Sequence, residues 1–246
     1  AMSDWRGIFV AFMLFSIISM LWMGARLPET LTLENRRKFS LKTLFAATIE
    51  LFGYRRVRIS ILCQSMMFAL LFGMLSMVHP IYDITFERAE SFPYWFGLIS
   101  LIAGSASLLN ASIVVRFGMR NVITVSYGVQ IIFSLIMLLL SLSPPSDTIY
   151  FGLFIVWQTS IFFLAGMTFG NLNALAMEPV GHIAGLAASL LGGLATFIGT
   201  LLAIPVGLMF SGTPSPLAAA SIVFCTLATA LMLRLRAYEN RDAQAA

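Results

Sequence analysis

The sequence predicts an all-α transmembrane protein with seven membrane-spanning helices, and three observations support this fold class. Hydrophobic residues make up 59% of the chain and charged residues only 11%, and the mean hydropathy of +0.90 lies outside the range of soluble domains. Seven apolar stretches are each long enough to cross a hydrocarbon core of ~30 Å as a helix. These stretches are continuously apolar, unlike the alternating strands of membrane β-barrels.

The spans follow one another with few interruptions. In chain order they cover residues 7–25, 59–78, 94–115, 122–142, 149–169, 183–210 and 216–235, and Arg234 is the one charged residue inside them. The connections at 116–121, 143–148 and 211–215 are too short to contain a catalytic domain. The connection at 79–93 is longer and acidic. In the connection at 170–182 we expect Pro179 to end one helix before the next begins.

A long polar segment, 26–58, separates the first span from the other six. Ser40 can cap a helix within it. The apolar residues of that helix would share one face: Leu41, Leu44, Phe45, Ile49 and Phe52. We expect this amphipathic helix to lie on the membrane surface, with Arg55, Arg56 and Arg58 near lipid headgroups. Binding of a protein partner is the alternative interpretation of the same pattern.

The distribution of basic residues predicts the orientation in the membrane. If the N-terminus is outside, thirteen of the fifteen Lys and Arg residues fall on one side, and only Arg6 and Arg88 fall on the other. The positive-inside rule identifies the basic side as the cytoplasm. The C-terminus is then cytoplasmic. The positive charge reflects this topology and contact with the lipid bilayer, and gives no reason to expect a nucleic-acid partner.

Groups that enzymes or cofactor proteins need are missing from the spans. His79 and His182 lie at opposite ends of the membrane, and the only lysines, Lys38 and Lys42, lie in the polar segment. No buried carboxylate pair and no hydrolase or metalloprotease motif occurs. Cys63 and Cys225 both lie inside spans and suggest packing. We therefore expect no enzyme activity, no catalytic residue, no cofactor and no metal site.

Polar and aromatic side chains share one face in each of two spans. Gln64, Phe68 and Phe72 recur every fourth residue in the second span, while Gln158 and Phe162 occupy one face of the fifth, which Phe169 continues. An apolar cavity with a few amide groups suits small amphiphilic compounds. The candidates for substrate binding are therefore Gln64, Phe68, Phe72, Gln158 and Phe162. Helix packing with glutamine as polar glue is the alternative.

The sixth span carries a stripe of small residues at every fourth position, Gly181, Gly185, Ser189 and Gly193. Such a stripe lets another helix approach closely, either as a static contact or as two helices that rock against each other.

Five short segments stand out in order along the chain: DWRGIF at 4–9, LPETL at 27–31, FPYWFG at 92–97, RFGMR at 116–120 and GHIAGLAAS at 181–189. Together they resemble the Bcr/CflA group of drug:proton antiporters in the major facilitator superfamily. DWRGIF at 4–9 and LPETL at 27–31 look like that group's sixth helix and the following loop. FPYWFG at 92–97 looks like its eighth helix, Asn110 through RFGMR at 116–120 like the eighth-to-ninth loop, and GHIAGLAAS at 181–189 like its eleventh helix.

The resemblance implies that the chain corresponds to helices six to twelve of a twelve-helix transporter. Residues 1–27 would be the last helix of the N-terminal half, 28–56 the cytoplasmic linker and 57–246 the C-terminal six-helix half. The implied function is export of drugs or other small amphiphilic compounds by proton antiport, in the cell membrane (the bacterial inner membrane). The proton-coupling half, which the resemblance places before Ala1, would be the partner.

The resemblance also implies gating and packing roles. Asn110 and the loop residues Arg116, Gly118 and Arg120 resemble the superfamily's cytoplasmic loop motif in its reduced C-half form. The usual acidic residue of that motif has no counterpart at Val114 or Val115. The stripe Gly181, Gly185, Ser189 and Gly193 would face the other half of the transporter.

Two other classes remain open. A seven-span receptor would have the same placement of its termini, although a retinal-binding lysine is missing and the first cytoplasmic loop is the longest. A structural membrane subunit without transport activity, such as a half-transporter that assembles as a dimer, fits the same spans.

Overall fold

The computed structural model describes residues 5–27 and 41–245, and it divides the chain into two units that are described separately here. The first unit covers residues 1–43 and contains α1 (Trp5–Arg26). The apolar side chains of α1 are exposed all around the helix within this unit; Phe12 and Trp22, for example, are each 66% exposed. A helix that is apolar on every side requires lipid or other helices around it.

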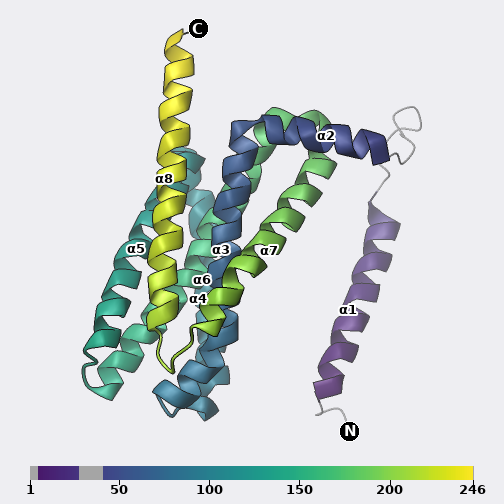
Figure 1. Cartoon of the computed structure of the whole chain (residues 1–246). Helices are drawn as coiled ribbons and strands as arrows, with labels where there is room; N and C mark the ends of the chain where they lie inside the picture. The colour runs from purple at the N-terminus through teal and green to yellow at the C-terminus, as the bar shows by residue number, and fades with distance from the viewer. Residues whose placement is uncertain (1–4, 28–40, 246) are drawn as a thin grey trace. The chain divides into compact units, whose positions relative to one another are not determined.

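The second unit begins within α2 (Leu41–Gly53) and is a bundle of long helices (Figure 1). Its further elements are α3 (Arg55–Pro80), the π-helix η2 (Ile81–Thr85), the 3-10 helix η3 (Ala89–Ser91), α4 (Phe92–Phe117), α5 (Met119–Leu142), α6 (Asp147–Met177), the 3-10 helix η4 (Glu178–Ile183), α7 (Ala184–Leu208) and α8 (Ser215–Ala245).

The predicted fold class is confirmed. Among the described residues, seven helices are long and apolar enough to cross a membrane, one in the first unit and six in the second. The described part of the chain contains no β-strand. The protein is therefore a multi-pass α-helical membrane protein.

Two helices, α6 and α8, continue at their C-terminal ends by two turns or more beyond the predicted apolar stretches. Helix α6 continues past Gly170 to Met177, through a segment expected to be a connection, because Leu172, Leu175 and Ala176 are buried against other helices. Pro179 lies in η4, so the chain does leave the α-helix close to this proline, as expected. Helix α8 continues ten residues beyond the apolar stretch, to Ala245, and its last turns stand clear of the bundle in Figure 1.

The two ends of the second unit differ in charge. We call the end where α3, α5 and α7 begin the basic end, since Arg55, Arg56, Arg116 and Arg120 lie there; it is uppermost in Figure 1. The opposite end, which carries Asp83, Glu87, Glu90 and Asp147, we call the acidic end. Helix α2 runs crosswise at the basic end (Figure 1).

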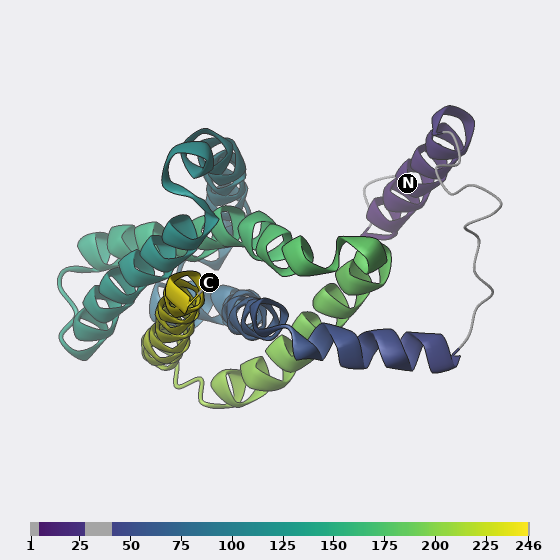
Figure 2. The same ribbon diagram turned by 90° about the horizontal axis from the view of Figure 1, so that it is seen from above.

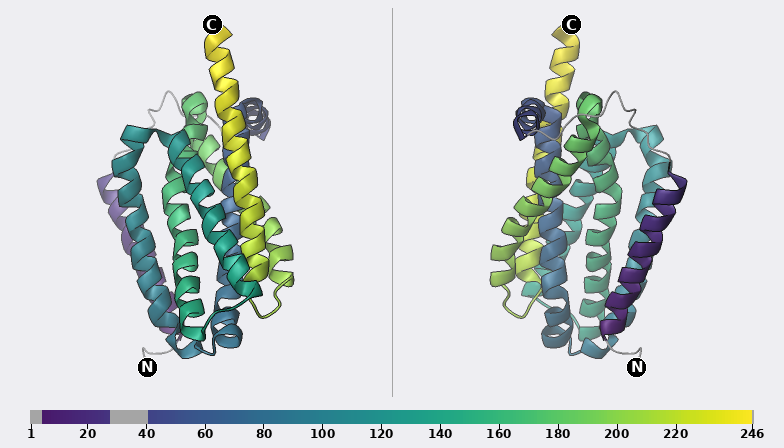
Figure 3. Two further views of the ribbon diagram at one scale, coloured as in Figure 1. Left: turned by 90° about the vertical axis from the view of Figure 1, so that its left-hand side faces the viewer. Right: turned by 90° about the vertical axis from the view of Figure 1, so that its right-hand side faces the viewer.

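Helix α3 is central to the bundle and packs against α6, α7 and α8. Helices α5 and α8 run side by side, and α6 packs on α4 and α5 (Figures 2 and 3). The main core cluster includes Met67, Leu70 and Met74 of α3 together with Phe154 and Trp157 of α6. Nonpolar packing between helices therefore organises the bundle.

A buried hydroxyl joins three of these helices. Ser134 of α5 donates to Ser221 of α8 at 2.7 Å and accepts from the indole Nε1 of Trp157 in α6 at 3.1 Å. Tyr127 of α5 donates to the carbonyl of Cys63 in α3 at 2.9 Å. These hydrogen bonds satisfy polar groups that would be costly to leave unpaired in an apolar interior.

Helix α2 occupies part of the polar segment between the first two spans. The face predicted to be apolar is exposed within the unit, at Phe45, Ile49 and Phe52. Leu51, on another side, is 2% exposed and packs with Val57 at the start of α3. An exposed apolar face on a helix that lies across the bundle's end is what a surface-lying helix requires. Residues 28–40, including Ser40 and Lys38, lie outside the described residues.

Candidate functional site

The candidate substrate residues of α3 meet the second half of α6. The side-chain amide of Gln64 donates from Nε2 to Asn173 Oδ1 at 2.9 Å. The Phe68 ring stacks on Phe72 at 5.6 Å and lies 4.7 Å from the ring of Phe169. The rings of Phe68 and Phe72 are half-buried, whereas Gln64 is 2% exposed. We call Gln64, Phe68, Phe72, Phe169 and Asn173 the inner cluster.

The candidate residues of α6 lie nearer to the acidic end. Gln158 is fully buried and accepts at Oε1 from the Tyr82 hydroxyl at 3.1 Å. Its Nε2 has no hydrogen-bond partner among the described residues. Phe162 makes an edge contact with Phe96 of α4, with ring centroids 5.6 Å apart. The structure thus places the five candidates in two groups at different depths.

A cavity opens between α3 and α7 beside the inner cluster. Its volume is about 440 Å³, and Phe72, Ser76, Thr200 and Phe210 are among the residues that line it. Cavities of a few hundred Å³ with apolar walls and few polar groups are typical of small-molecule sites. Phe72 is therefore both a member of the inner cluster and a lining residue of a cavity large enough for a small ligand.

Asn110 forms a reciprocal amide pair with a residue that the sequence analysis did not select. Asn171 Nδ2 donates to Asn110 Oδ1 at 2.7 Å, and Asn110 Nδ2 lies 3.4 Å from Asn171 Oδ1. The pair joins α4 and α6. Nearby, Gly166 of α6 sits against Ala106 of α4, where an added Cβ would lie 2.7 Å from the Ala106 Cβ. The amide pair and this close approach hold the two helices together.

The predicted loop motif forms the tight turn from α4 to α5. Gly118 has a φ of +78°, in the left-handed region that favours glycine. Arg116 is exposed and lies over the ring of its neighbour Phe117, with its Cζ 5.5 Å from the ring centroid. Arg120 instead points into a group of carboxylates.

Four charged side chains meet at the basic end, and we call Arg56, Arg120, Glu178 and Glu239 the charge cluster. Arg56 donates to Glu178 and to Glu239, both at 2.6 Å. Arg120 Nη2 donates to Glu239 Oε1 at 2.9 Å and lies 3.7 Å from Glu178 Oε2. The cluster joins the ends of α3, α5 and α8 to η4. Arg55 adds a contact, with its Cζ 3.6 Å from the Tyr238 ring centroid.

The loop motif has valine at 114 and 115 where an acidic residue is usual. Its Arg120 instead pairs with carboxylates from other parts of the chain, Glu178 and Glu239. Sequence reasoning missed Glu239 altogether. Its position could have suggested an ion pair, because Glu239 lies on the same side of the membrane as the thirteen basic residues. The side chains of Arg56, Arg120 and Glu178 are each about a third exposed, so solvent screens these pairs and each stabilises the fold only modestly.

The small-residue stripe is open within the second unit. Gly185, Ser189 and Gly193 lie on α7, whereas Gly181 lies before that helix, in η4. At Gly181, Gly185 and Gly193 an added Cβ would meet no atom within 4 Å. Ser189 is exposed, and its hydroxyl donates back to the Gly185 carbonyl at 3.0 Å. The structure does not describe the side chain of His182.

A second row of residues on α7, also spaced by four, makes the contact with α3. Its members are buried: Ala187, Leu191, Ala195, Gly199 and Ala203. At Gly199 an added Cβ would lie 2.5 Å from the Cβ of Phe68 and 2.8 Å from the carbonyl oxygen of Ser65. The sequence analysis did not identify this row, which is offset by two residues from the open stripe and so lies about 200° around the helix.

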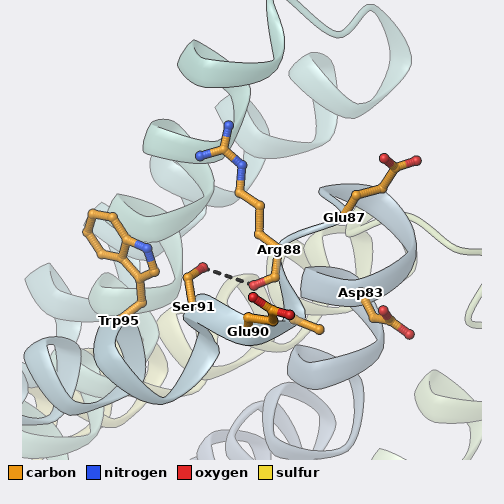
Figure 4. Close-up of a pocket in the computed structure, with 7 residues that line it drawn as sticks. Asp83, Glu87, Arg88, Glu90, Ser91 and Trp95 are labelled. Atoms are coloured by element: carbon orange, nitrogen blue, oxygen red, sulfur yellow. Dashed lines mark hydrogen bonds between the residues drawn. The ribbon is translucent and has the colours of Figure 1, made fainter.

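A pocket of about 640 Å³ lies at the acidic end, where Asp83, Glu87, Glu90 and Trp95 are among its lining residues (Figure 4). The Arg88 guanidinium extends away from Glu87 and Glu90 in this view. It donates to Asp147 at 2.7 Å, with its Cζ 4.6 Å from the Phe151 ring centroid. Arg88 thus joins the segment before α4 to the start of α6.

Comparison with known proteins decides the family. The family model of the Major Facilitator Superfamily matches residues 1–204, which is most of the chain. This chain belongs to the major facilitator superfamily. Membership indicates a role in membrane transport.

Among curated proteins, this major facilitator chain is similar to "Uncharacterized MFS-type transporter YdgK" of Bacillus subtilis (strain 168), with 26% identity over 215 residues. The match covers 84% of this chain and 50% of the relative, so the chain spans about half the length of the curated relative it matches. No solved structure gives a significant match.

Within the described residues, no group of three or more His, Cys, Asp or Glu side chains is placed to hold a metal ion. The polar groups available inside the bundle are amides and hydroxyls, which can orient a ligand by hydrogen bonds. At the inner cluster, such amide groups lie next to aromatic rings.

Proposed function

We propose that this chain forms one substrate-binding bundle of a secondary transporter of the Bcr/CflA type, which exports drugs or other small amphiphilic compounds in exchange for protons. The observation that carries this proposal is the inner cluster beside the cavity between α3 and α7. Half-buried phenyl rings offer apolar contact area, and the Gln64–Asn173 pair offers hydrogen bonds without fixed charge. This combination suits amphiphilic compounds of varied shape.

Within that proposal, Gln64, Phe68, Phe72, Gln158 and Phe162 contact the substrate. The amide Nε2 of the fully buried Gln158 has no hydrogen-bond partner among the described residues, and a hydrogen-bond acceptor on the substrate would satisfy it. An unpaired buried donor costs free energy, so pairing it would favour binding. We propose that Gln158 and Phe162 of α6 contact the substrate when the bundle is open toward the acidic end.

Proton coupling requires a group whose proton affinity changes as access alternates between the two sides. The central turns of the spans in this chain contain no Asp, Glu or His, and His79 and Asp147 lie at span ends. We propose that a second, N-terminal helix bundle supplies the coupling residues and contacts the open stripe Gly181, Gly185, Ser189 and Gly193. The length of the curated relative and the exposure of this stripe support the proposal.

We propose further that the basic end faces the cytoplasm of a bacterial inner membrane, with the N-terminus outside. The distribution of thirteen basic residues on one side supports this orientation. Reporter fusions after Lys38 and after Arg241 should both read cytoplasmic, and a fusion near Glu87 should read external. An external signal at Lys38 would contradict the proposed orientation.

A dye-transport assay tests the function. In the working transporter, Phe68→Ala and Phe162→Ala should raise the KM for efflux of an amphiphilic dye driven by an imposed pH gradient. Phe224→Ala is the matched control, because Phe224 is a partly buried ring on α8 outside both groups of candidates. Equal effects of all three substitutions would contradict the assignment of the substrate site.

A reconstitution experiment tests the division of labour. The purified chain alone in vesicles should show no dye accumulation driven by a pH gradient, and co-expression with a matching five-helix N-terminal portion should restore it. Robust gradient-driven transport by the 246-residue chain alone would contradict the proposed second bundle.

A further inference from the structure

A small polar pocket lies at the basic end, between the α4–α5 turn and α8. Its volume is about 290 Å³, and its charged lining residues are Arg120, Arg236 and Glu239, with Asn121, Asn240 and Phe117 also on its walls. Two gating candidates, Gly118 and Arg120, line this pocket, but Arg236 was not a candidate in the sequence analysis.

Arg236 lacks an acidic partner in the described part of the chain. Its Nη1 donates to Asn121 Oδ1 at 3.2 Å, and no described carboxylate lies within ion-pair distance of it. Arg120 shares Glu239 with Arg56. The charged residues that line the pocket are Arg120, Arg236 and Glu239, so its net charge is plus one. Because Glu239 pairs with Arg120, Arg236 is the lining cation that remains available to an anion.

The surroundings of the pocket are apolar on the side toward the membrane. Phe117 is 54% exposed, and Leu233, which lies one helical turn before Arg236 in α8, is 51% exposed. An anion in the pocket that carried acyl chains would place them along these surfaces. A soluble anion would gain the charge contacts alone. This combination of cationic pocket and apolar margin favours a lipid.

We propose that this pocket binds the phosphate group of an anionic phospholipid, with Arg236 as its principal ligand and Arg120 as the second cation. Basic pockets between transmembrane helices at the cytoplasmic surface suit anionic headgroups. The first turn of α5 adds backbone N–H groups that have no acceptor within the helix. The bound lipid would bridge α8 to the α4–α5 turn. The inference does not depend on which compound is transported.

The test uses the full chain purified in a neutral detergent and titrated with phosphatidylglycerol. Bound lipid is counted by native mass spectrometry, and the thermal unfolding midpoint is measured in parallel. Phosphatidylglycerol should bind and raise the midpoint, whereas phosphatidylcholine and soluble glycerol phosphate at equal concentration should not. Arg236→Gln should weaken phosphatidylglycerol binding about fivefold, which corresponds to about 1 kcal/mol per basic residue at an anionic surface.

Arg234→Gln is the matched control, since it removes the same charge from α8 two residues away, on another face of the helix. It should leave phosphatidylglycerol binding within twofold of the wild-type protein. Three results would overturn the proposal: equal losses in Arg234→Gln and Arg236→Gln, unchanged binding in Arg236→Gln, or glycerol phosphate that stabilises as well as the lipid. The last result would identify a site for a free anion.

Discussion

The two faces of α7 carry rows of residues with the same four-residue spacing, but the second unit packs on only one of them. Ala187, Leu191, Ala195, Gly199 and Ala203 are buried, and Gly199 touches the backbone of α3. On the other face, Gly185 and Gly193 have open space around them and Ser189 is exposed, as is Gly181 in η4 just before α7. The buried row fixes α7 to its own bundle.

The difference shows that packing within the second unit requires glycine at one of these positions of α7 and not at the others. At Gly199 a side chain cannot be accommodated without moving α3. At Gly185 and Gly193 a side chain has room, so packing in this unit does not require glycine there. A close contact with another helix bundle would require it, and we attribute the open stripe to that contact.

The largest effect on folding is expected at Gly199. Gly199→Ala places a Cβ 2.5 Å from Phe68 Cβ and 2.8 Å from the Ser65 carbonyl oxygen, so α3 and α7 must separate. Overpacking of this kind costs about 1–3 kcal/mol or more. Thermal unfolding in detergent should show a clearly lower midpoint. Gly193→Ala is the control and should stay within about 0.5 kcal/mol of the wild-type protein. If both variants unfold alike, the two faces are not distinct.

A second close contact tests whether glycine at a helix crossing is a general requirement in this bundle. Gly166→Ala would place a Cβ 2.7 Å from the Ala106 Cβ. The nearest atom here is a side-chain methyl, and the nearest backbone atom is 3.5 Å away, so a smaller loss than at Gly199 is expected, about 1 kcal/mol. The measurement is the same unfolding midpoint. A greater loss than in Gly199→Ala would reverse the expected order.

The charge cluster provides a weaker attachment near the start of α7. Glu178→Gln removes the contacts of η4 with Arg56 and Arg120. Because these side chains are about a third exposed, the expected loss is below about 1 kcal/mol. High salt should reduce the difference between variant and wild-type protein. A loss as large as that of Gly199→Ala would mean that ion pairs, not packing, hold α7 in place.

The sequence predicted the number of spans and the class of fold because a bilayer demands continuous apolar stretches. It did not predict which face of α7 meets α3. Small residues at every fourth position predict a close helix contact, but they do not reveal whether the contacting helix belongs to the same bundle. The buried row was also harder to recognise because it includes the large residue Leu191. The extension of α6 to Met177 was missed because Gly170 and Asn171 suggested a connection, whereas burial of Leu172 and Leu175 favours the helix.

Spacing within one helix likewise predicted only part of the side-chain arrangement around the candidate site. Spacing along α3 placed Gln64, Phe68 and Phe72 on one face, and the structure brings them together with Phe169. Asn171, Asn173 and Glu239 were not selected, because their partners come from other helices and no periodicity within one helix reveals such pairing. The pairing of these three side chains depends on tertiary contacts between helices.

The most direct test of the central claim is the transport activity of Gly185→Leu. Open space around Gly185 in the second unit predicts an unfolding midpoint and a membrane insertion level close to those of the wild-type protein. In the working transporter, dye efflux driven by a pH gradient should be abolished, since leucine would block the contact with the second bundle. Gly128→Leu on α5, also in open space, should remain active. Full efflux activity in Gly185→Leu, measured per amount of inserted protein, would contradict the account and place the open stripe against lipid.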